Sequence, residues 1–308
     1  MMTEMKNPSR LSKTRGSILI ASLWTLSVFS IFVSSVAYQA GQQAVLLKRE
    51  TQNFESRAEF LTALNLLGQI ILEDPAPGED SPADKWYGKV ASPDLEDRHM
   101  LLTVRDEESR IDINKASQLL LETLFKAVSD SGTPLKGEAK DFSKAILKLR
   151  GKGKILSLEE LYLLEDVEAA DIERLRPYIT VYTQFPGLNI NSADLLALNA
   201  FIESLPASDF SKRDLMEALK KFRNTPDAAG QKGIFLSDEL APDFFLQKLH
   251  LTSNVSMVQM ASQLLPYMTT DSRHWHLIMT SSSGRSAETV IRLTNTNENF
   301  EILNWREY

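Results

Sequence analysis

The chain has 308 residues, no cysteine and a formal net charge of −7 at neutral pH. Its length permits a sizeable core and favours either one body with an insertion or two modules. Without cysteine it has no disulfides and no thiolate metal sites. Its negative charge disfavours general nucleic-acid binding, which needs clustered lysine and arginine. No G-x-S-x-G, H-E-x-x-H or glycine-rich dinucleotide motif occurs, so we predict no catalytic residues and no enzyme activity.

The N-terminal region carries a long uncharged stretch. No charged residue occurs from Ser17 to Leu47, and residues 18–37 are mainly apolar. Because about twenty apolar residues cross the hydrocarbon core as a helix, we predict that residues 17–40 span a membrane. The basic residues before them predict a cytoplasmic N-terminus. A cleaved secretory signal or a simple signal anchor is the alternative, but the stretch exceeds a usual signal core and lacks a well-placed A-x-A site.

The predicted helix continues beyond the membrane as a stem. Apolar residues recur at helical spacing as Leu61, Leu64, Leu67 and Ile71. A helix from Ile18 to Leu72 would be about 80 Å long, so half of it stands outside the bilayer and packs on a body. The segment 74–84, rich in proline, glycine and aspartate, ends this helix.

Strand signals occur on both sides of a helical middle. Residues 99–104 and 110–113 flank a charged turn and predict a β-hairpin. Residues 274–280, 287–294 and 300–305 predict a three-stranded meander. His274 and His276 lie on one face of its first strand, where a metal could bridge them, but an exposed pair is the favoured interpretation.

An internal repeat marks the helical middle. Residues 111–116 (IDINKA) recur as residues 188–193 (LNINSA), and Asn114 and Asn191 are predicted helix N-caps. Further helices are predicted at residues 141–149, after the Ser157–Glu160 capping box, and at residues 171–175. The fold class is therefore α+β, with the long N-terminal helix packed on an antiparallel sheet and a large all-α insertion. The predicted divisions are 1–16, 17–40, 41–113, 114–245 (two small helical modules) and 246–308.

Four segments together resemble the K-type minor pseudopilins of type II secretion (general secretion pathway protein K). They are the basic junction ending in Gly16-Ser17, residues 106–114, residues 159–193 and the closing Trp305-Arg306-Glu307. The resemblance covers nearly the whole chain and implies a pilin-like body with a helical insert. It also implies that residues 1–16 are a leader, cut between Gly16 and Ser17 by a prepilin peptidase, and that the new N-terminus at Ser17 is methylated.

The implied function is that of a non-enzymatic subunit at the tip of the pseudopilus, which helps to initiate its assembly and protein export across the outer membrane. The implied location is the inner membrane, crossed once, with the body in the periplasm. Implied partners are the I- and J-type minor pseudopilins, the major pseudopilin, the prepilin peptidase and the inner-membrane assembly platform, together with the secretin and exported proteins. Nucleic acid is not among them.

Ala21 is the fifth residue of the implied mature chain, where most pilin-like subunits carry glutamate. A carboxylate in hydrocarbon is costly unless a partner neutralises it, and a subunit at the tip has none ahead of it. Ala21 therefore favours the tip. Alternatively, it is simply one more apolar membrane residue.

No cofactor is required, but the resemblance implies that structural calcium can bind. Oxygen-rich loops suit this ion, and the candidates are residues 74–84, 106–108 and 238–243. Plain solvated acidic loops are the simpler interpretation of each, and we assign no ligands.

A membrane-anchored DNA-binding protein of a competence or uptake system is the alternative function. Small helical modules with Asn-x-Asn starts resemble helix-hairpin-helix units, and one helix carries a lysine stripe: Lys136, Lys140, Lys144 and Lys148. The net negative charge opposes this alternative, and such a stripe is usually a solvated face.

Overall fold

The computed structural model describes residues 11–74, 78–90, 93–97, 99–132, 134–164, 167–225, 233–294 and 300–308. The chain divides into two compact units, residues 1–58 and residues 59–308. Residues 1–10 of the predicted leader lie outside the described residues.

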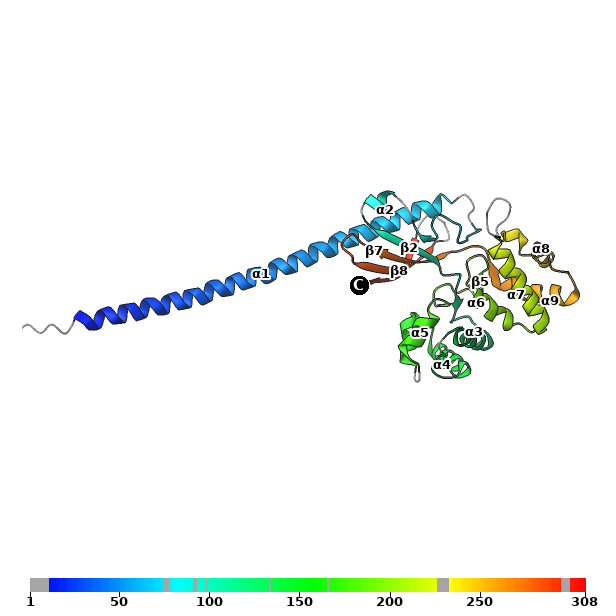
Figure 1. Cartoon of the computed structure of the whole chain (residues 1–308), viewed down its shortest axis with the longest axis horizontal. Helices are drawn as coiled ribbons and strands as arrows, with labels where there is room; N and C mark the ends of the chain where they lie inside the picture. The colour runs from blue at the N-terminus through cyan, green and yellow to red at the C-terminus, as the bar shows by residue number, and fades with distance from the viewer. Residues whose placement is uncertain are drawn as a thin grey trace, which may run out of the picture. The chain divides into compact units, whose positions relative to one another are not determined.

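Helix α1 runs from Leu11 to Leu72, through the first unit and into the second (Figure 1). Within the described part of the chain, its segment Ser17–Leu72 is the one helix long and apolar enough to cross a membrane. Hydroxyl groups in this segment donate to carbonyls of the same helix: Ser22 to Leu19, Thr25 to Ala21 and Ser27 to Leu23. These polar groups are therefore satisfied within the helix, as a hydrocarbon environment requires.

The last turns of α1, from residue 59 on, pack in the core of the second unit. The buried side chains are Phe60, Ala63 and Leu67, which lie with Trp86 and Trp275. The predicted stem face is partly wrong, because Leu61 is 49% exposed. Apolar residues occur on more than one side of this segment, so their spacing alone does not select the face that meets the sheet.

A five-stranded antiparallel sheet forms the body, in the order β1-β2-β7-β8-β9. Its strands are β1 (Gly88–Lys89), β2 (Leu101–Asp106), β7 (His274–Thr280), β8 (Ser286–Leu293) and β9 (Phe300–Glu307). Helix α2 (Pro93–Asp97) lies between β1 and β2 in sequence. Strands β7, β8 and β9 pair in succession, which confirms the predicted C-terminal meander. The apolar and β-branched runs of these strands, separated by turn residues, are the pattern that predicted them.

The predicted hairpin of residues 99–113 is wrong. Strand β2 pairs with β1 and β7, whereas β3 (Ile111–Asp112) leaves the sheet and pairs in parallel with β4 (Ile179–Thr180). The partner of β3 is far away in sequence, and local spacing cannot reveal such a pair.

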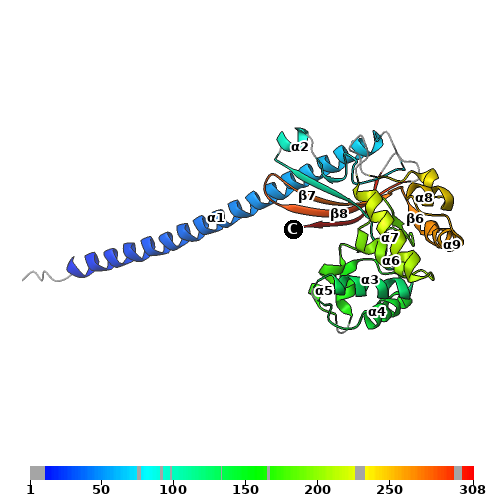
Figure 2. The same cartoon turned by 45° about the vertical axis from the view of Figure 1, so that its right-hand side comes forward.

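The insert consists of two modules, each enclosed by a pair of parallel strands. The first module contains β3, α3 (Gln118–Asp130), α4 (Ala139–Lys152), η1 (Leu158–Leu163), α5 (Ala169–Leu175) and β4. The second contains β5 (Leu188–Asn189), α6 (Leu195–Glu203), α7 (Asp209–Asn224), η2 (Ser237–Glu239), α8 (Pro242–Lys248), α9 (Val255–Leu264), η3 (Leu265–Tyr267) and β6 (Met268–Thr269). Figure 2 shows α3, α4 and α5 gathered in one group and α8 and α9 in another.

Two expectations for the insert need correction. It is not all-α, because the strand pairs β3–β4 and β5–β6 close its modules. It also extends past residue 245, since α9 and β6 belong to the second module. Asn254 caps α9 by accepting a bond from the Met257 amide, a start signal that the predicted boundary overlooked.

The repeat is real, but its asparagines do not cap helices. Ser117 and Asp194 are the caps of α3 and α6. Instead, the Asn114 side chain exchanges two hydrogen bonds of 2.9 Å with the backbone of Ile155. Asn191 does the same with Phe235, at 3.0 and 2.8 Å. A carboxamide offers both a donor and an acceptor, so each asparagine joins two backbone segments of its module.

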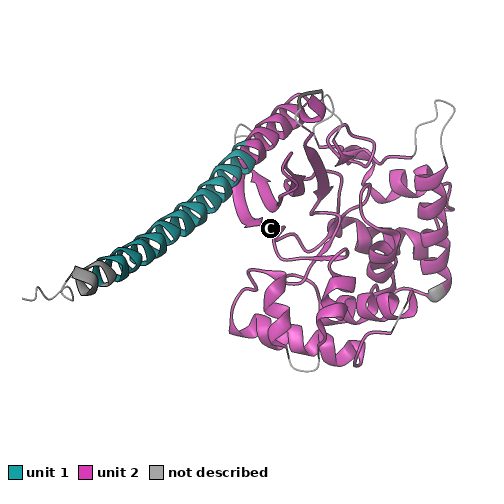
Figure 3. Ribbon diagram, turned by 60° about the vertical axis from the view of Figure 1, so that its left-hand side comes forward, with its two compact units in different colours: residues 1–58 teal, residues 59–308 magenta. Residues whose placement is uncertain are grey.

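The helices of the insert, the sheet and the end of α1 all lie in the second unit (Figure 3). Two apolar cores stabilise this unit, one between α1 and the sheet and one through both modules. Polar residues fill the region where the sheet meets the modules.

Candidate functional site

The junction segment, residues 106–112, leads from β2 into the first module and is largely buried. Arg110 Nη1 donates to Glu107 Oε1 at 2.7 Å, and the Thr180 hydroxyl of β4 donates to the other oxygen of Glu107. Ser192 of the second module donates to Asp106. The junction segment therefore ties the sheet to both modules through buried polar bonds.

Both histidines of β7 are buried, so the predicted exposed pair is wrong. His274 Nδ1 lies 2.7 Å from Glu108 Oε1, and His276 Nε2 lies 2.6 Å from Glu288 Oε1. Their partners come from the junction segment and from β8. Glu108 and Glu288 are not neighbours of the histidines in sequence, so the H-x-H spacing could not predict these contacts.

Burial controls the protonation of this region. Burial raises the pKa of Glu108 to about 8 and raises the pKa of Asp106 well above its usual value, where the nearby Glu108 charge adds to the effect. Burial also lowers the pKa of His274 to about 4. At neutral pH Glu108 therefore keeps its proton beside the neutral imidazole of His274.

We expect the stability of the second unit to fall as pH rises from 6.5 to 8. Unfolded Glu108 is ionised in this window, whereas folded Glu108 keeps its proton, so the unfolded state binds fewer protons. His274 is neutral in both states above its unfolded pKa and adds nothing to the slope. One such carboxyl group lowers the free energy of unfolding by up to about 1.4 kcal/mol for each pH unit. Urea unfolding of the full-length chain in detergent, followed by tryptophan fluorescence, measures this slope.

The matched variants are Glu108→Gln and Glu217→Gln. Glu108→Gln removes one of the carboxyl groups with a raised pKa and should make the slope shallower, whereas Glu217 is an exposed residue of α7 and its variant should keep the slope. Equal slopes in the two variants would show that Glu108 does not hold its proton in the folded chain.

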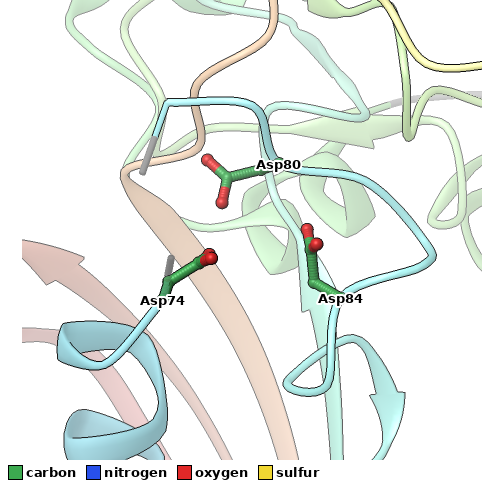
Figure 4. A group of neighbouring side chains, drawn as sticks. All are labelled: Asp74, Asp80 and Asp84. Carbon is green, nitrogen blue, oxygen red and sulfur yellow. The ribbon is translucent and has the colours of Figure 1, made fainter. Parts of the chain in front are cut away.

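Three carboxylates converge beside this region and form the aspartate cluster: Asp74, Asp80 and Asp84 (Figure 4). One oxygen of each lies within 4.8 Å of the others. Asp80 accepts from the Ser272 amide at 2.5 Å, Asp84 from the Ser81 amide at 2.6 Å, and Asp74 from Trp86 Nε1 at 3.3 Å. Each carboxylate is thus oriented by the surrounding chain.

The aspartate cluster fits a calcium ion by its chemistry and its spacing. Calcium prefers oxygen ligands at 2.3–2.6 Å, so two oxygens on one ion lie at most about 5.2 Å apart. Burial raises the pKa of Asp80 to about 8, and the charges of Asp106, Asp271 and Asp84 raise it further against the Ser272 bond. A divalent cation bound by the cluster would reduce the repulsion between these carboxylates. Without a cation, protonation of Asp80 reduces it.

The other two candidate loops, residues 106–108 and 238–243, have no group of three converging carboxylates among the described residues. In the described chain, the carboxylates of residues 106–108 accept bonds from protein donors such as Ser192, Thr180 and His274. Glu239 of the third loop pairs with Lys248 at 2.5 Å. Of the three candidate loops, residues 74–84 have the carboxylates that converge, and Ser272 and Thr270, which precede β7, bind this loop at Asp80 and Gly78.

The predicted processing residues lie on α1. Gly16 and Ser17 belong to this helix, Ser17 and Ala21 are exposed, and the Ala21 carbonyl accepts from the Thr25 hydroxyl at 2.8 Å. Cleavage after Gly16 and methylation of Ser17 remain predictions.

All four lysines of the stripe are exposed, but the prediction of one helix is partly wrong, because Lys136 precedes α4. Lys136 pairs with Glu168 at 2.9 Å and Lys144 lies 3.6 Å from Asp141, while Phe142 and Ile146 are buried opposite. Neighbouring acids thus partly neutralise the stripe, which suits a solvated face better than a DNA surface.

Comparison with known proteins identifies the fold. A chain in the crystal structure of the GspK-GspI-GspJ complex from the enterotoxigenic Escherichia coli type 2 secretion system is similar, with a TM-score of 0.58 and 14% sequence identity. The match covers 85% of this chain and 99% of that chain. No family model and no curated protein sequence matches. The fold is therefore the one that the resemblance to K-type minor pseudopilins predicts: an apolar N-terminal helix, an antiparallel sheet and a helical insert.

Proposed function

We propose that the chain is a non-enzymatic minor pseudopilin of type II secretion, which helps to initiate pseudopilus assembly and protein export across the outer membrane. The observation that carries this proposal is the shared fold, which extends over 99% of a chain in the GspK-GspI-GspJ complex. The apolar helix Ser17–Leu72 fits a single-pass membrane anchor. The sequence patterns around Gly16 support the same class.

The proposed location follows from the charges around this helix. Basic residues precede the apolar stretch, which favours a cytoplasmic leader, an inner-membrane anchor and a periplasmic body. The proposed partners are the I- and J-type minor pseudopilins, because that complex contains GspI and GspJ. The major pseudopilin, the prepilin peptidase, the assembly platform, the secretin and exported proteins complete the proposal.

Ala21 supports a place at the tip. It offers no carboxylate to neutralise the N-terminal amine of a subunit ahead, and an alanine in hydrocarbon has no charge to pair. We further propose that the aspartate cluster holds a structural calcium ion, which would neutralise its carboxylates and join the end of α1 to the loop before β1.

Crosslinking tests the proposed function. With a photoreactive residue at Leu19, near the mature N-terminus, we expect a single adduct with another minor pseudopilin, and co-purification of tagged full-length chain with the I and J types. The same probe in the major pseudopilin is the control and should give ladders. Ladders of this chain with itself would exclude the tip, and failure to recover either minor pseudopilin would contradict the class.

A further inference from the structure

A large cavity lies where the body faces the second module. Its volume is about 890 Å³. The body contributes Tyr87 and Arg105, the junction segment contributes Arg110, and the second module contributes Ser192, Asp194 and Arg223. This size falls within the range of ligand sites in proteins.

The cavity presents donors that lack acceptors. Arg105 on β2 is exposed and has no hydrogen bond or ion pair from its side chain among the described residues. The half-buried Tyr87 hydroxyl likewise has no hydrogen-bond partner in the described parts of the chain. Arg223 donates to the Ala193 carbonyl at 2.5 Å but forms no salt bridge with any described carboxylate. Two guanidinium groups and a hydroxyl therefore line one cavity with Asp84 and Asp194, and neither guanidinium forms a salt bridge with a described carboxylate.

These groups lie close enough to act on one another. Burial raises the pKa of Tyr87, and the positive charges of Arg105, Arg110 and Arg223 all act against that rise. Burial lowers the pKa of Arg223 despite the Asp194 charge, so its guanidinium is poorly solvated and poorly compensated.

The acids of the cavity are engaged elsewhere. Asp194 caps α6 by accepting from the Leu196 amide at 2.7 Å, and Asp84 belongs to the aspartate cluster, where it accepts from Ser81. Arg110, by contrast, is already paired with Glu107. The cations with spare bonding capacity are therefore Arg105 and Arg223.

The cavity continues along the sheet. A second hollow of about 370 Å³ shares Arg105, Arg110 and Pro177 with the first and reaches Arg176 and Arg306. The last two pair with Glu173 and Glu159. We call these two adjacent hollows together the groove. Because both are lined by Arg105 and Arg110, a length of chain could contact both, whereas a compact metabolite would occupy one.

We propose that this groove binds an acidic peptide segment of another protein. Arg105 and Arg223 would form salt bridges with its carboxylates, and the Tyr87 hydroxyl would donate a hydrogen bond to it. A guanidinium group can donate two parallel hydrogen bonds to one carboxylate, and this geometry makes a carboxylate a better partner than water. This inference goes beyond the proposed function and rests on the residues that line the groove, on their hydrogen bonds and on their charges.

Fluorescence anisotropy tests the proposal with the full-length chain in detergent. The probe is a labelled ten-residue peptide rich in Asp and Glu, and its Asn and Gln analogue is the control peptide. We expect binding of the acidic peptide alone, weaker at high salt because exposed charges are screened. Arg105→Gln and Arg223→Gln should each weaken binding about tenfold, which corresponds to about 1.4 kcal/mol.

Arg213→Gln is the matched control variant, since Arg213 is an exposed residue of α7, the helix that carries Arg223, but does not line the groove. Its affinity should be unchanged. If Arg223→Gln lowers the melting temperature, the affinity of Arg105→Gln becomes the test of the proposal. The Arg105 side chain makes no hydrogen bond or salt bridge within the described chain, so its loss should not destabilise the fold. Equal affinity in all three variants, equal competition by inorganic phosphate, or tighter arginine-dependent binding of single-stranded DNA would each overturn the proposal.

Discussion

Replacement of Gly16 by leucine is expected to leave the whole population of this chain as an uncleaved precursor. The peptidase implied by the resemblance cuts the Gly16–Ser17 bond, and glycine permits a close approach of another backbone that a branched side chain blocks. Cleavage would remove four of the 34 basic residues and one of the 41 acidic residues, which changes the net charge from −7 to −10. Intact mass and N-terminal sequencing of the membrane fraction measure the outcome.

Ser17→Ala is the matched control, because it changes the neighbouring residue and leaves the glycine in place. It should be processed like the wild type. A mature chain that begins near Ala37 or Ala40, with or without Gly16, would instead show removal of the apolar stretch by a conventional signal peptidase.

Calcium is expected to raise the melting temperature of the full-length chain by about 5–10 °C. An ion present at 100 times its Kd adds about 2.7 kcal/mol of stability, and a unit of this size gains about 2–4 °C per kcal/mol. The gain should be larger at pH 8 than at pH 6, because the ion competes with the proton that the raised pKa of Asp80 retains up to about pH 8. Trp86 bonds to Asp74, so its fluorescence should respond as well.

Asp84→Asn should abolish most of this gain, whereas Asp243→Asn should keep it. Asp243 is an exposed residue in the first turn of α8, and the described structure does not group it with other carboxylates. Identical melting of the wild type in calcium and in chelator would show that the aspartate cluster takes protons alone.

Sequence patterns predicted those elements whose partners are close along the chain. The meander of β7 to β9 follows from apolar and β-branched runs separated by turn residues, and helix α4 from the spacing of Phe142 and Ile146. Gly187 shows the opposite case. A Cβ there would lie 1.8 Å from the Tyr267 carbonyl oxygen, yet nothing near Gly187 in sequence indicates that contact.

The candidate site was harder to predict than the fold. Asp106, Glu107 and Glu108 look like an exposed charged turn, because buried acids are rare and their partners Ser192, Thr180 and His274 are supplied by three distant segments. The one usable signal was the repeat, since Asn114 and Asn191 occupy equivalent positions before equivalent backbone partners. It predicted two modules, and a pair of parallel strands encloses each of the two segments, but it gave the asparagines the wrong bonds.

The parallel strand pairs have a consequence for how the chain can diverge. Each pair brings the entry and the exit of a module side by side, at Ile111 with Ile179 and at Leu188 with Met268. Helices between these points can therefore lengthen, shorten or be lost while the ends stay in register, and the sheet does not have to move. Substitutions in the modules therefore need not disturb the sheet, so the surfaces of the modules can change while the body keeps its fold.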